Sequence, residues 1–335
     1  MIRSLYRAPD GQARTDLRPD EFKTALQDTG NLLWVDLGDE PADICEPILG
    51  EIFGFHPLAV EDALQESHVP KVDDWGEYLY IVLHAVTFAP SDGNEFDVAQ
   101  HKVDTPELDV FVGSQYLVTY RSQDIAAVGR LWTACQRDKR HLHKGVAHLL
   151  YELADGLVAD YMPVVEQLDE AIDYIEERVF TDPDPTLLEQ IFALKRAIVH
   201  LRRIIAPQRE VLNKLARGDY AVIDMRDRVF FRDVYDHLVR LYDINESLRD
   251  LVGGAMEAYL SVVNNRMNEV VKTLTIVTAF FMPLAFITGF FGMNFFQAVA
   301  PLEPWTGEAM FVLTLATMVL TPVAMYLWMR KRAWM

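Results

Sequence analysis

Acidic side chains are the groups in this sequence best suited to bind a metal cation. The 335 residues carry 50 acidic and 31 basic side chains, which gives a formal net charge of −19 at pH 7. Such a charge repels nucleic acid and attracts metal cations, although it also keeps a protein soluble. A Gly-rich phosphate loop and a nucleophile elbow are both missing from the sequence. We therefore expect cation binding, no catalytic residues, no enzymatic activity and no nucleic-acid partner.

The softer metal ligands are scattered along the chain. Cys45 and Cys135 lie in no CxxC or CxxH context, which is typical of core thiols in a reducing compartment. His141 and His143 could bind Zn²⁺, but isolated cytoplasmic histidines are more often structural or solvated. The N-terminus has no apolar run that could serve as a signal peptide, so we expect the large part that precedes the membrane segments to be cytoplasmic.

Two long uncharged runs near the C-terminus predict a membrane protein. Residues 273–302 form a run of 30 residues, and residues 309–329 form a second run of 21. A helix needs about 20 apolar residues to cross a bilayer, so the first span is expected to end near residue 291. A buried helix of a soluble protein is the alternative for either run, but two such runs so close together favour two transmembrane helices.

The distribution of charge around these runs predicts their orientation. Basic residues flank the outer ends of the pair: Arg266, Lys272, Arg330, Lys331 and Arg332. The connecting loop has no basic residue and carries two acids, Glu303 and Glu308. By the positive-inside rule both chain ends face the cytoplasm and the loop faces out. Two helices are too few to enclose an ion path, so several copies of one span are expected to surround a common axis.

The first 143 residues have the pattern of a cytoplasmic α/β domain. Apolar or alternating runs predict strands at 32–38 and 78–88, and residues 107–121 read as two strands around a Gly-Ser-Gln turn. Helical spacing is found at 43–65 and 124–137.

Residues 144–218 predict an antiparallel helical hairpin. An acidic helix over 144–180 is ended by Asp-Pro-Asp-Pro at 182–185, because proline lacks the backbone donor. A basic helix over 186–216 follows, with Gly218 as its C-terminal cap. The opposite charges of the two faces would attract each other, but exposed ion pairs contribute little to stability.

A third helix is expected to begin near Asp227 and to continue into the first span, since no proline occurs before Pro283. Sixty-odd residues at about 1.5 Å each would extend over roughly 95 Å, and such a helix would couple the cytoplasmic domain to the membrane. The predicted organisation is an α+β membrane protein with five parts: the α/β domain (1–143), the hairpin (144–218), the stalk and first transmembrane helix (219–291), the outer loop (292–308), and the second transmembrane helix with a basic tail (309–335).

The sequence resembles the CorA family of magnesium channels, which have two spans and a Gly-x-Asn motif. The resemblance covers essentially the whole chain and is carried by three segments: RMNEVVKTLTIVTAFFMPLAFITGFFGMNF (266–295), FFRDVYDHLVRLYDINESLRD (230–250) and HVPKVDDWGEYLYIVLHAV (68–86). It implies a homopentamer with a funnel-shaped cytoplasmic domain, located in the cell inner membrane. It also implies a channel for Mg²⁺, with Co²⁺ and Ni²⁺ as surrogates, that is gated by cytoplasmic Mg²⁺.

The resemblance implies that Gly292, Met293 and Asn294 form the selectivity filter at the outer mouth. Five Asn294 amide oxygens would accept hydrogen bonds from the water that Mg²⁺ retains, and neutral amides would still let the ion leave. Helical spacing back from Asn294 selects one stripe: Gly289, Ala285, Met282, Thr278, Leu274 or Thr275, Val271 and Asn268. Spacing alone would favour ordinary packing, whereas the resemblance implies that the stripe lines the pore, with a constriction at Leu274 and Val271 and a polar ring at Asn268.

The resemblance also implies a regulatory Mg²⁺ site between cytoplasmic domains. Asp233 matches the acid that the family carries on its stalk helix. Its partner would come from the N-terminal domain, where Asp92, Glu95 and Asp97 are equal candidates. Bridging by Mg²⁺ would lock the subunits together, and loss of the ion would let their repulsion open the pentamer.

The outer loop and the pore stripe depart from the usual family pattern. The loop reads FFQAVAPLEPWTGEAM (295–310), and Ala285 stands where a threonine is common. These departures leave open a Zn²⁺ transporter like the ZntB branch, some of whose relatives are proton-linked carriers. A membrane-anchored structural or signalling domain is the alternative from another class.

Overall fold

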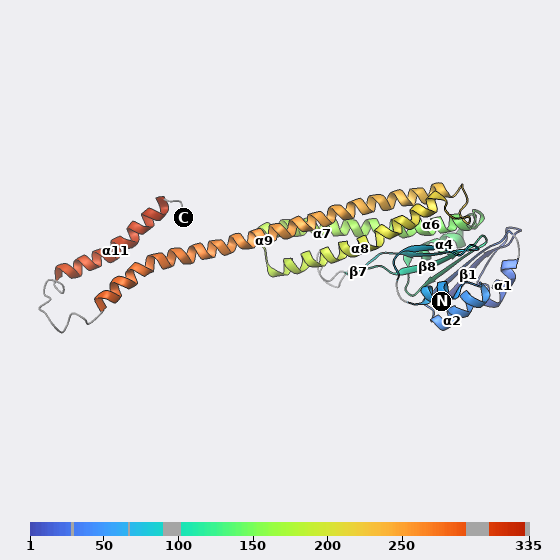
Figure 1. Cartoon of the computed structure of the whole chain (residues 1–335), viewed down its shortest axis with the longest axis horizontal. Coiled ribbons are helices and arrows are strands. Elements are labelled where there is room, and N and C mark those ends of the chain that lie inside the picture. The colour runs from blue at the N-terminus through green and yellow to red at the C-terminus, as the bar shows by residue number, and fades with distance from the viewer. Residues whose placement is uncertain (28–29, 66–67, 90–101, 293–307, 332–335) are drawn as a thin grey trace. The chain divides into compact units, whose positions relative to one another are not determined.

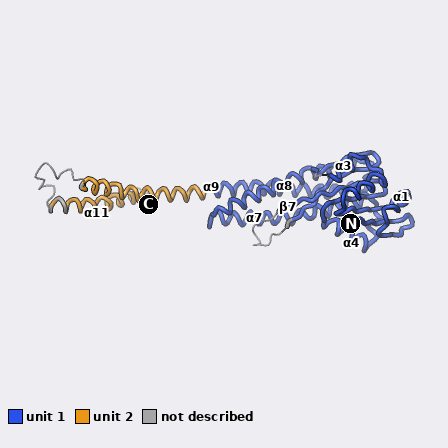
Figure 2. Tube along the Cα trace, turned by 90° about the horizontal axis from the view of Figure 1, so that it is seen from below, with its two compact units in different colours: residues 1–259 blue, residues 260–335 orange. Residues whose placement is uncertain are grey.

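The structure is a computed structural model of the chain (Figure 1). It describes all residues except 28–29, 66–67, 90–101, 293–307 and 332–335. The chain divides into two compact units, Met1–Tyr259 and Leu260–Met335 (Figure 2).

A seven-stranded mixed sheet forms the centre of the first unit, with the strand order β2-β1-β3-β9-β8-β5-β4. The strands are β1 (Ile2–Arg7), β2 (Ala13–Thr15), β3 (Leu32–Gly38), β4 (Lys71–Asp74), β5 (Leu79–His84), β8 (Glu107–Val112) and β9 (Tyr116–Arg121). Only β3 and β9 run parallel among these neighbours. A separate two-stranded sheet pairs β6 (Thr87–Ala89) with β7 (Lys102–Asp104). The strand predicted at 32–38 and the hairpin predicted at 107–121 are confirmed, whereas the run 78–88 is divided between β5 and β6.

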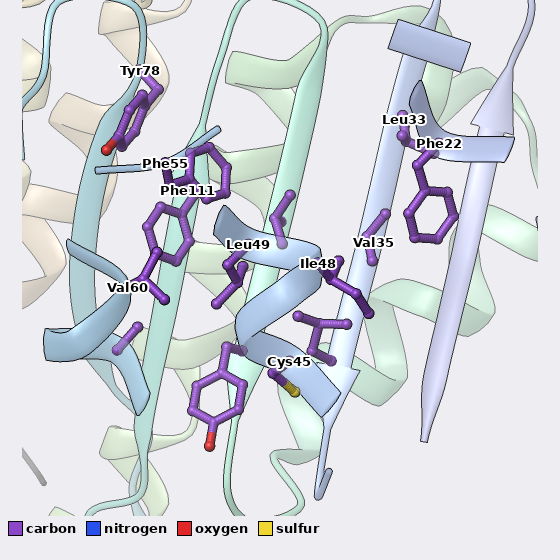
Figure 3. Close-up of a cluster of buried hydrophobic side chains, with 14 of the residues drawn as sticks. Phe22, Leu33, Val35, Cys45, Ile48, Leu49, Phe55, Val60, Tyr78 and Phe111 are labelled. Carbon is purple, nitrogen blue, oxygen red and sulfur yellow. The ribbon is translucent and has the colours of Figure 1, made fainter. Parts of the chain in front are cut away.

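The sheet is buried on both faces, as the uninterrupted burial of β3 indicates. Leu33 and Val35 point into a cluster formed with α2 (Ala42–Pro47), the π-helical turn Ile48–Ile52 and α3 (Pro57–Leu64) (Figure 3). Trp34 points the other way, because neighbouring strand residues alternate between faces. Its ring lies 4.9 Å from that of Trp132 in α4 (Ala126–Arg137), a helix predicted from the sequence.

The remaining regular elements of the described chain are helices. They are α1 (Pro19–Gln27), α5 (Arg140–His143), α6 (Val146–Ala159), α7 (Tyr161–Thr181), α8 (Pro185–Arg217), α9 (Arg228–Gly292) and α11 (Glu308–Lys331). The helices α7 and α8 are neighbours joined by three residues and form the predicted antiparallel hairpin (Figure 1). In α7 and α8, which the structure describes in full, no ion pair joins an acid of the first helix to a base of the second. The hairpin is held by its buried apolar stripes instead.

The single helix predicted over 144–180 is wrong, since α6 ends at Ala159 and α7 begins at Tyr161. Pro163 explains the break. It has no backbone N–H to donate to the carbonyl of Ala159, so the helical hydrogen-bond ladder cannot continue through this point. Asp160 instead donates its N–H to the carbonyl of Leu157 in a tighter turn.

The helical segment predicted at 43–65 is also interrupted. Gly54 has a φ of +72°, a left-handed conformation that separates the π-helical turn from α3.

Both predicted ends of the second hairpin helix are confirmed. At the start of α8 the Asp184 carboxylate accepts hydrogen bonds from the N–H groups of Thr186 (2.7 Å) and Leu187 (3.1 Å), with Pro185 as the first helical residue. At its end Gly218 has a φ of +76° and donates its N–H to the carbonyl of Leu215.

We expect replacement of Gly218 by alanine to destabilise the protein by about 1 kcal/mol or more, because alanine disfavours a left-handed backbone. An added Cβ would also meet the Arg228 guanidinium at 1.9 Å and displace it. Gly129→Ala is the matched control, since Gly129 lies within α4 and a Cβ there meets nothing within 4 Å. That change should be neutral or stabilise by up to about 1 kcal/mol. Thermal unfolding of the two full-length variants measures the contrast, and equal effects would contradict it.

The prediction of one helix from near Asp227 through the first span is confirmed by α9, which is 65 residues long. Its first part packs in the first unit through residues at helical spacing, including Phe231, Val234, Leu238 and Leu241. Asn245 donates a hydrogen bond to the Ile198 carbonyl of α8 at 3.2 Å. In the second unit, α9 and α11 each contain a stretch long and apolar enough to cross a membrane, and these stretches are almost wholly unburied within the chain. A helix covered by a protein core would not have that property.

Candidate cation pathway and acids of the first unit

The stripe predicted to line the pore lies on the C-terminal half of α9 and is uncovered in the single chain. All seven positions are exposed: Asn268, Val271, Leu274, Thr278, Met282, Ala285 and Gly289. A different stripe of the same helix is half-buried: Ile276, Ala279, Phe280, Pro283, Leu284 and Ile287. The two stripes do not overlap, so the predicted pore residues are free to meet residues of other copies of the chain.

The threonine hydroxyl groups on this half of α9 are satisfied within the helix. Thr278 donates to the carbonyl of Leu274 at 2.9 Å, and Thr275 donates to that of Val271 at 2.8 Å. Polar groups in a bilayer need such internal partners, because no water is available there. Thr278 therefore presents a hydroxyl oxygen, which can still accept hydrogen bonds, on an otherwise apolar stretch of the stripe.

The tripeptide predicted as the selectivity filter begins where α9 ends. Gly292 is the last residue of the helix. Met293, Asn294 and Glu303 lie outside the residues that the structure describes, and Glu308 is the first residue of α11. The basic residues Arg330 and Lys331 occupy the last turn of α11.

Asp233, the predicted regulatory acid, is exposed near the start of α9. The acids of α6 lie close to it. Burial is the main cause that raises the pKa of Asp155; His237 lowers this pKa, while the charges of Asp233 and Glu152 raise it. Burial is also the main cause that raises the pKa of Tyr151, and the charges of Asp155, Asp233 and Glu152 raise it further. These couplings place Glu152, Asp155 and Asp233 near one another in the first unit. Glu152 is also paired there with Lys144, whose Nζ lies 3.6 Å from its carboxylate.

Asp155 is the acid that the sequence reasoning missed. Its half-buried position faces the stalk only because α6 and α9 lie side by side, and the sequence spacing of 78 residues contains no sign of that contact. The predicted partners Asp92, Glu95 and Asp97 lie outside the described residues.

Other metal ligands are not assembled in the described part of the chain, where no group of three His, Cys, Asp or Glu side chains could hold an ion directly. His141 is hydrogen bonded to the Glu152 carboxylate at 2.7 Å, and His143 is exposed. Cys45 and Cys135 are free and buried, as expected of core thiols. Burial raises their pKa values to about 11 and about 12, which keeps both thiols protonated and unreactive.

Comparisons with known proteins agree on one family. A family model described as CorA-like Mg²⁺ transporter protein matches residues 30–331. The cobalt/magnesium transport protein CorA of Thermotoga maritima is 33% identical over 94% of this chain and 89% of its own length. The zinc transport protein ZntB of Yersinia pseudotuberculosis is 26% identical over 83% and 81%. The solved CorA magnesium transporter of Methanocaldococcus jannaschii shares the fold, with a TM-score of 0.80, 23% identity, and coverage of 99% of this chain and 98% of that one.

Proposed function

Because this chain belongs to the CorA-like Mg²⁺ transporter family and is a divalent cation transporter of the membrane, we propose that it is a homopentameric channel for Mg²⁺, with Co²⁺ and Ni²⁺ as surrogates. The five copies of α9 would surround the ion path in the inner membrane. Gly292, Met293 and Asn294 would form its outer mouth, and both chain ends would be cytoplasmic.

The observation that carries this proposal is the exposed stripe of α9 that leads to Gly292. Its apolar positions Leu274 and Val271 would close the pore by excluding water, and the hydroxyl oxygen of Thr278 and the Asn268 amide would contact hydrated ions. A ring of such neutral oxygens fits Mg²⁺, which gives up its inner water reluctantly.

Flux into liposomes tests the function directly. The purified oligomer should carry Mg²⁺ and Co²⁺ down their gradients, at a rate that does not change with a pH gradient. Uptake of Zn²⁺ in preference to Mg²⁺, driven by a proton gradient, would favour the zinc-transporter alternative suggested by the ZntB relative. A well-folded oligomer without any divalent flux would leave only the membrane-anchor alternative.

We further propose that cytoplasmic Mg²⁺ gates the channel through the acids around Asp233. The coupling among these acids supports this: after burial, the charges of Asp233 and Glu152 raise the pKa of Asp155, and a divalent cation would relieve that repulsion. The predicted partners Asp92, Glu95 and Asp97 remain candidates for the same ion.

Replacing Asp233 by alanine or lysine is expected to reduce the protection that Mg²⁺ gives the full-length protein against proteolysis. The Mg²⁺ concentration that halves the cleavage rate should rise about tenfold, the effect of losing roughly 1.4 kcal/mol of binding free energy. Asp236→Ala is the matched control, because Asp236 is an exposed acid of the same helix, and its variant should retain normal protection. Unchanged protection in the Asp233 variants would discard this site.

A further inference from the structure

His84, the last residue of β5, sits where the sheet meets both helices of the hairpin. Its backbone N–H donates to the side-chain oxygen of Gln208 in α8 at 2.8 Å, and its carbonyl accepts from the hydroxyl of Tyr161 in α7 at 3.0 Å. All three residues are buried. This one residue therefore connects the end of a central strand to two helices.

The imidazole ring of His84 has two acceptors and no described donor. Nδ1 lies 2.9 Å from the carbonyl oxygen of Thr105, and Nε2 lies 2.7 Å from that of His68. A backbone carbonyl can only accept a hydrogen bond. A neutral imidazole carries one N–H and one lone pair, so one of its nitrogens would face a carbonyl oxygen with lone pair against lone pair. Both contacts are favourable only if both nitrogens carry protons.

A buried imidazolium needs a counter-ion, and the sheet register provides one. His84 and Glu107 are directly opposite each other in the antiparallel β5–β8 ladder. The Glu107 carboxylate lies 4.0 Å from Nε2, and 12% of its side chain is exposed, against 2% for His84. That carboxylate also accepts the N–H of His68 at 2.6 Å. The side chain and the neighbouring backbone are thus held in one charged, hydrogen-bonded arrangement.

We infer that both ring nitrogens of His84 carry protons, with Glu107 as the counter-ion of the ring, and that this pair fixes the end of β5 from which the His84 backbone binds the α7–α8 hairpin. The ring ties the segments of His68 and Thr105 to the end of β5, and Thr105 is itself bonded to His200 of α8 through its hydroxyl at 2.9 Å. Loss of one ring proton would place a lone pair against a carbonyl and remove the buried charge partner of Glu107, whose other oxygen lies 3.6 Å from Nδ1 of the more exposed His68. The role is one of positioning, and it does not depend on the proposed channel function.

The charged and titratable groups around the pair come from every neighbouring element. They are His68, whose Nδ1 lies 3.6 Å from Glu107, with Asp62 and Lys71 beyond it, Asp104 and Asp109 along β7 and β8, His200 from α8, and Tyr161 from α7. Asp109 does not serve as a second counter-ion, since burial first, and then the charge of Glu107, raise its pKa well above the usual range. Glu107 is accordingly the carboxylate assigned to the imidazolium.

Nitrogen NMR of the full-length protein in lipid, labelled with ¹⁵N-histidine, tests the protonation state, because protonated and unprotonated ring nitrogens resonate separately. The signals that disappear in His84→Gln should both be of the protonated type at neutral pH. If either of the signals that disappear in His84→Gln is of the unprotonated type, the inference is overturned. Should His84→Gln not fold, Glu107→Gln retains the ring and is expected to show a new unprotonated nitrogen. Absence of that signal would equally reject Glu107 as the counter-ion.

Melting of the same proteins tests the fastening role. His84→Gln and Glu107→Gln should each lower the midpoint by about 6 °C or more, since each removes one member of a buried charge pair. The double variant should melt no lower than the less stable single variant, because the two side chains act as one unit. His143→Gln, which replaces an exposed histidine, should leave the midpoint unchanged. Fully additive shifts would refute the pairing.

Discussion

Replacing Asn294 by alanine is expected to abolish Mg²⁺ flux into liposomes while the oligomer stays intact. Under the proposed function five copies of this amide meet at the outer mouth, where they replace part of the outer hydration of the ion. Alanine offers no oxygen, so a hydrated cation would enter a ring without hydrogen-bond acceptors. A loss of at least about 2 kcal/mol of stabilisation, roughly a thirtyfold fall in rate, is the minimum expected from removing several such bonds.

Gln297→Ala is the matched control, because it removes an amide from the same outer loop three residues further along. Size-exclusion chromatography of both variants establishes that assembly is unaffected. Retained flux in the Asn294 variant, or equal loss in the Gln297 variant, would refute the role given to Asn294 and leave the family assignment untouched.

The largest expected effect on stability is that of replacing Asp36 by asparagine. The Asp36 carboxylate is fully buried in β3 and lies 2.8 Å from Nε of Arg3 and 3.3 Å from Nη2 of Arg121. It also accepts the hydroxyl of Thr119 at 2.8 Å. Asparagine keeps the shape but leaves two guanidinium groups without their shared counter-charge. We expect the free energy of unfolding to fall by about 3–5 kcal/mol.

Asp124 provides a matched control for Asp36, because it is bound to the same arginine. Its carboxylate lies 2.9 Å from Nη1 of Arg121, but 88% of its side chain is exposed. Asp124→Asn should therefore cost no more than about 1 kcal/mol. Denaturant titration of the full-length variants measures both losses. Equal losses would show that burial does not set the strength of this ion pair.

The elements that could be predicted were those whose signal is local. The run LLWVDLG became β3 because apolar β-branched and aromatic residues suit a strand buried on both faces. Asp184, Pro185 and Gly218 fixed the ends of α8 through capping chemistry that acts within a few residues. The absence of proline between Asp227 and Pro283 was enough to predict one continuous α9.

The errors arose where one residue outweighed a longer pattern. Pro163 ends the hydrogen-bond ladder of α6, although the apolar spacing continues past it into α7. The hairpin of β1 and β2 was not predicted, yet Pro9-Asp10-Gly11 is a strong turn sequence, and Gly11 has a φ of +84°.

The candidate site also contains residues that local spacing selects and residues that only the packing of distant elements brings together. Helical spacing from Asn294 selects one stripe of α9, because residues on one helix keep a fixed angular relation. All residues over 263–275 are exposed, whichever way they face, so the pore-lining role of the stripe stays a prediction. The closeness of Asp155 to Asp233 depends on the packing of α6 against α9, which no spacing within either helix encodes. The cross-strand pair of His84 and Glu107 likewise depends on the β5–β8 register.

The two outer strands of the seven-stranded sheet show how the first unit avoids self-association through its backbone. A free strand edge offers unpaired N–H and carbonyl groups to the edge of another molecule, and long apolar edges therefore seed aggregates. Here β2 has only three residues and includes Arg14, while β4 has four residues, of which Lys71, Asp73 and Asp74 are charged. Extending a second sheet onto either edge would bury charge for few hydrogen bonds. Copies of this unit can therefore be held at high local concentration without joining sheet to sheet.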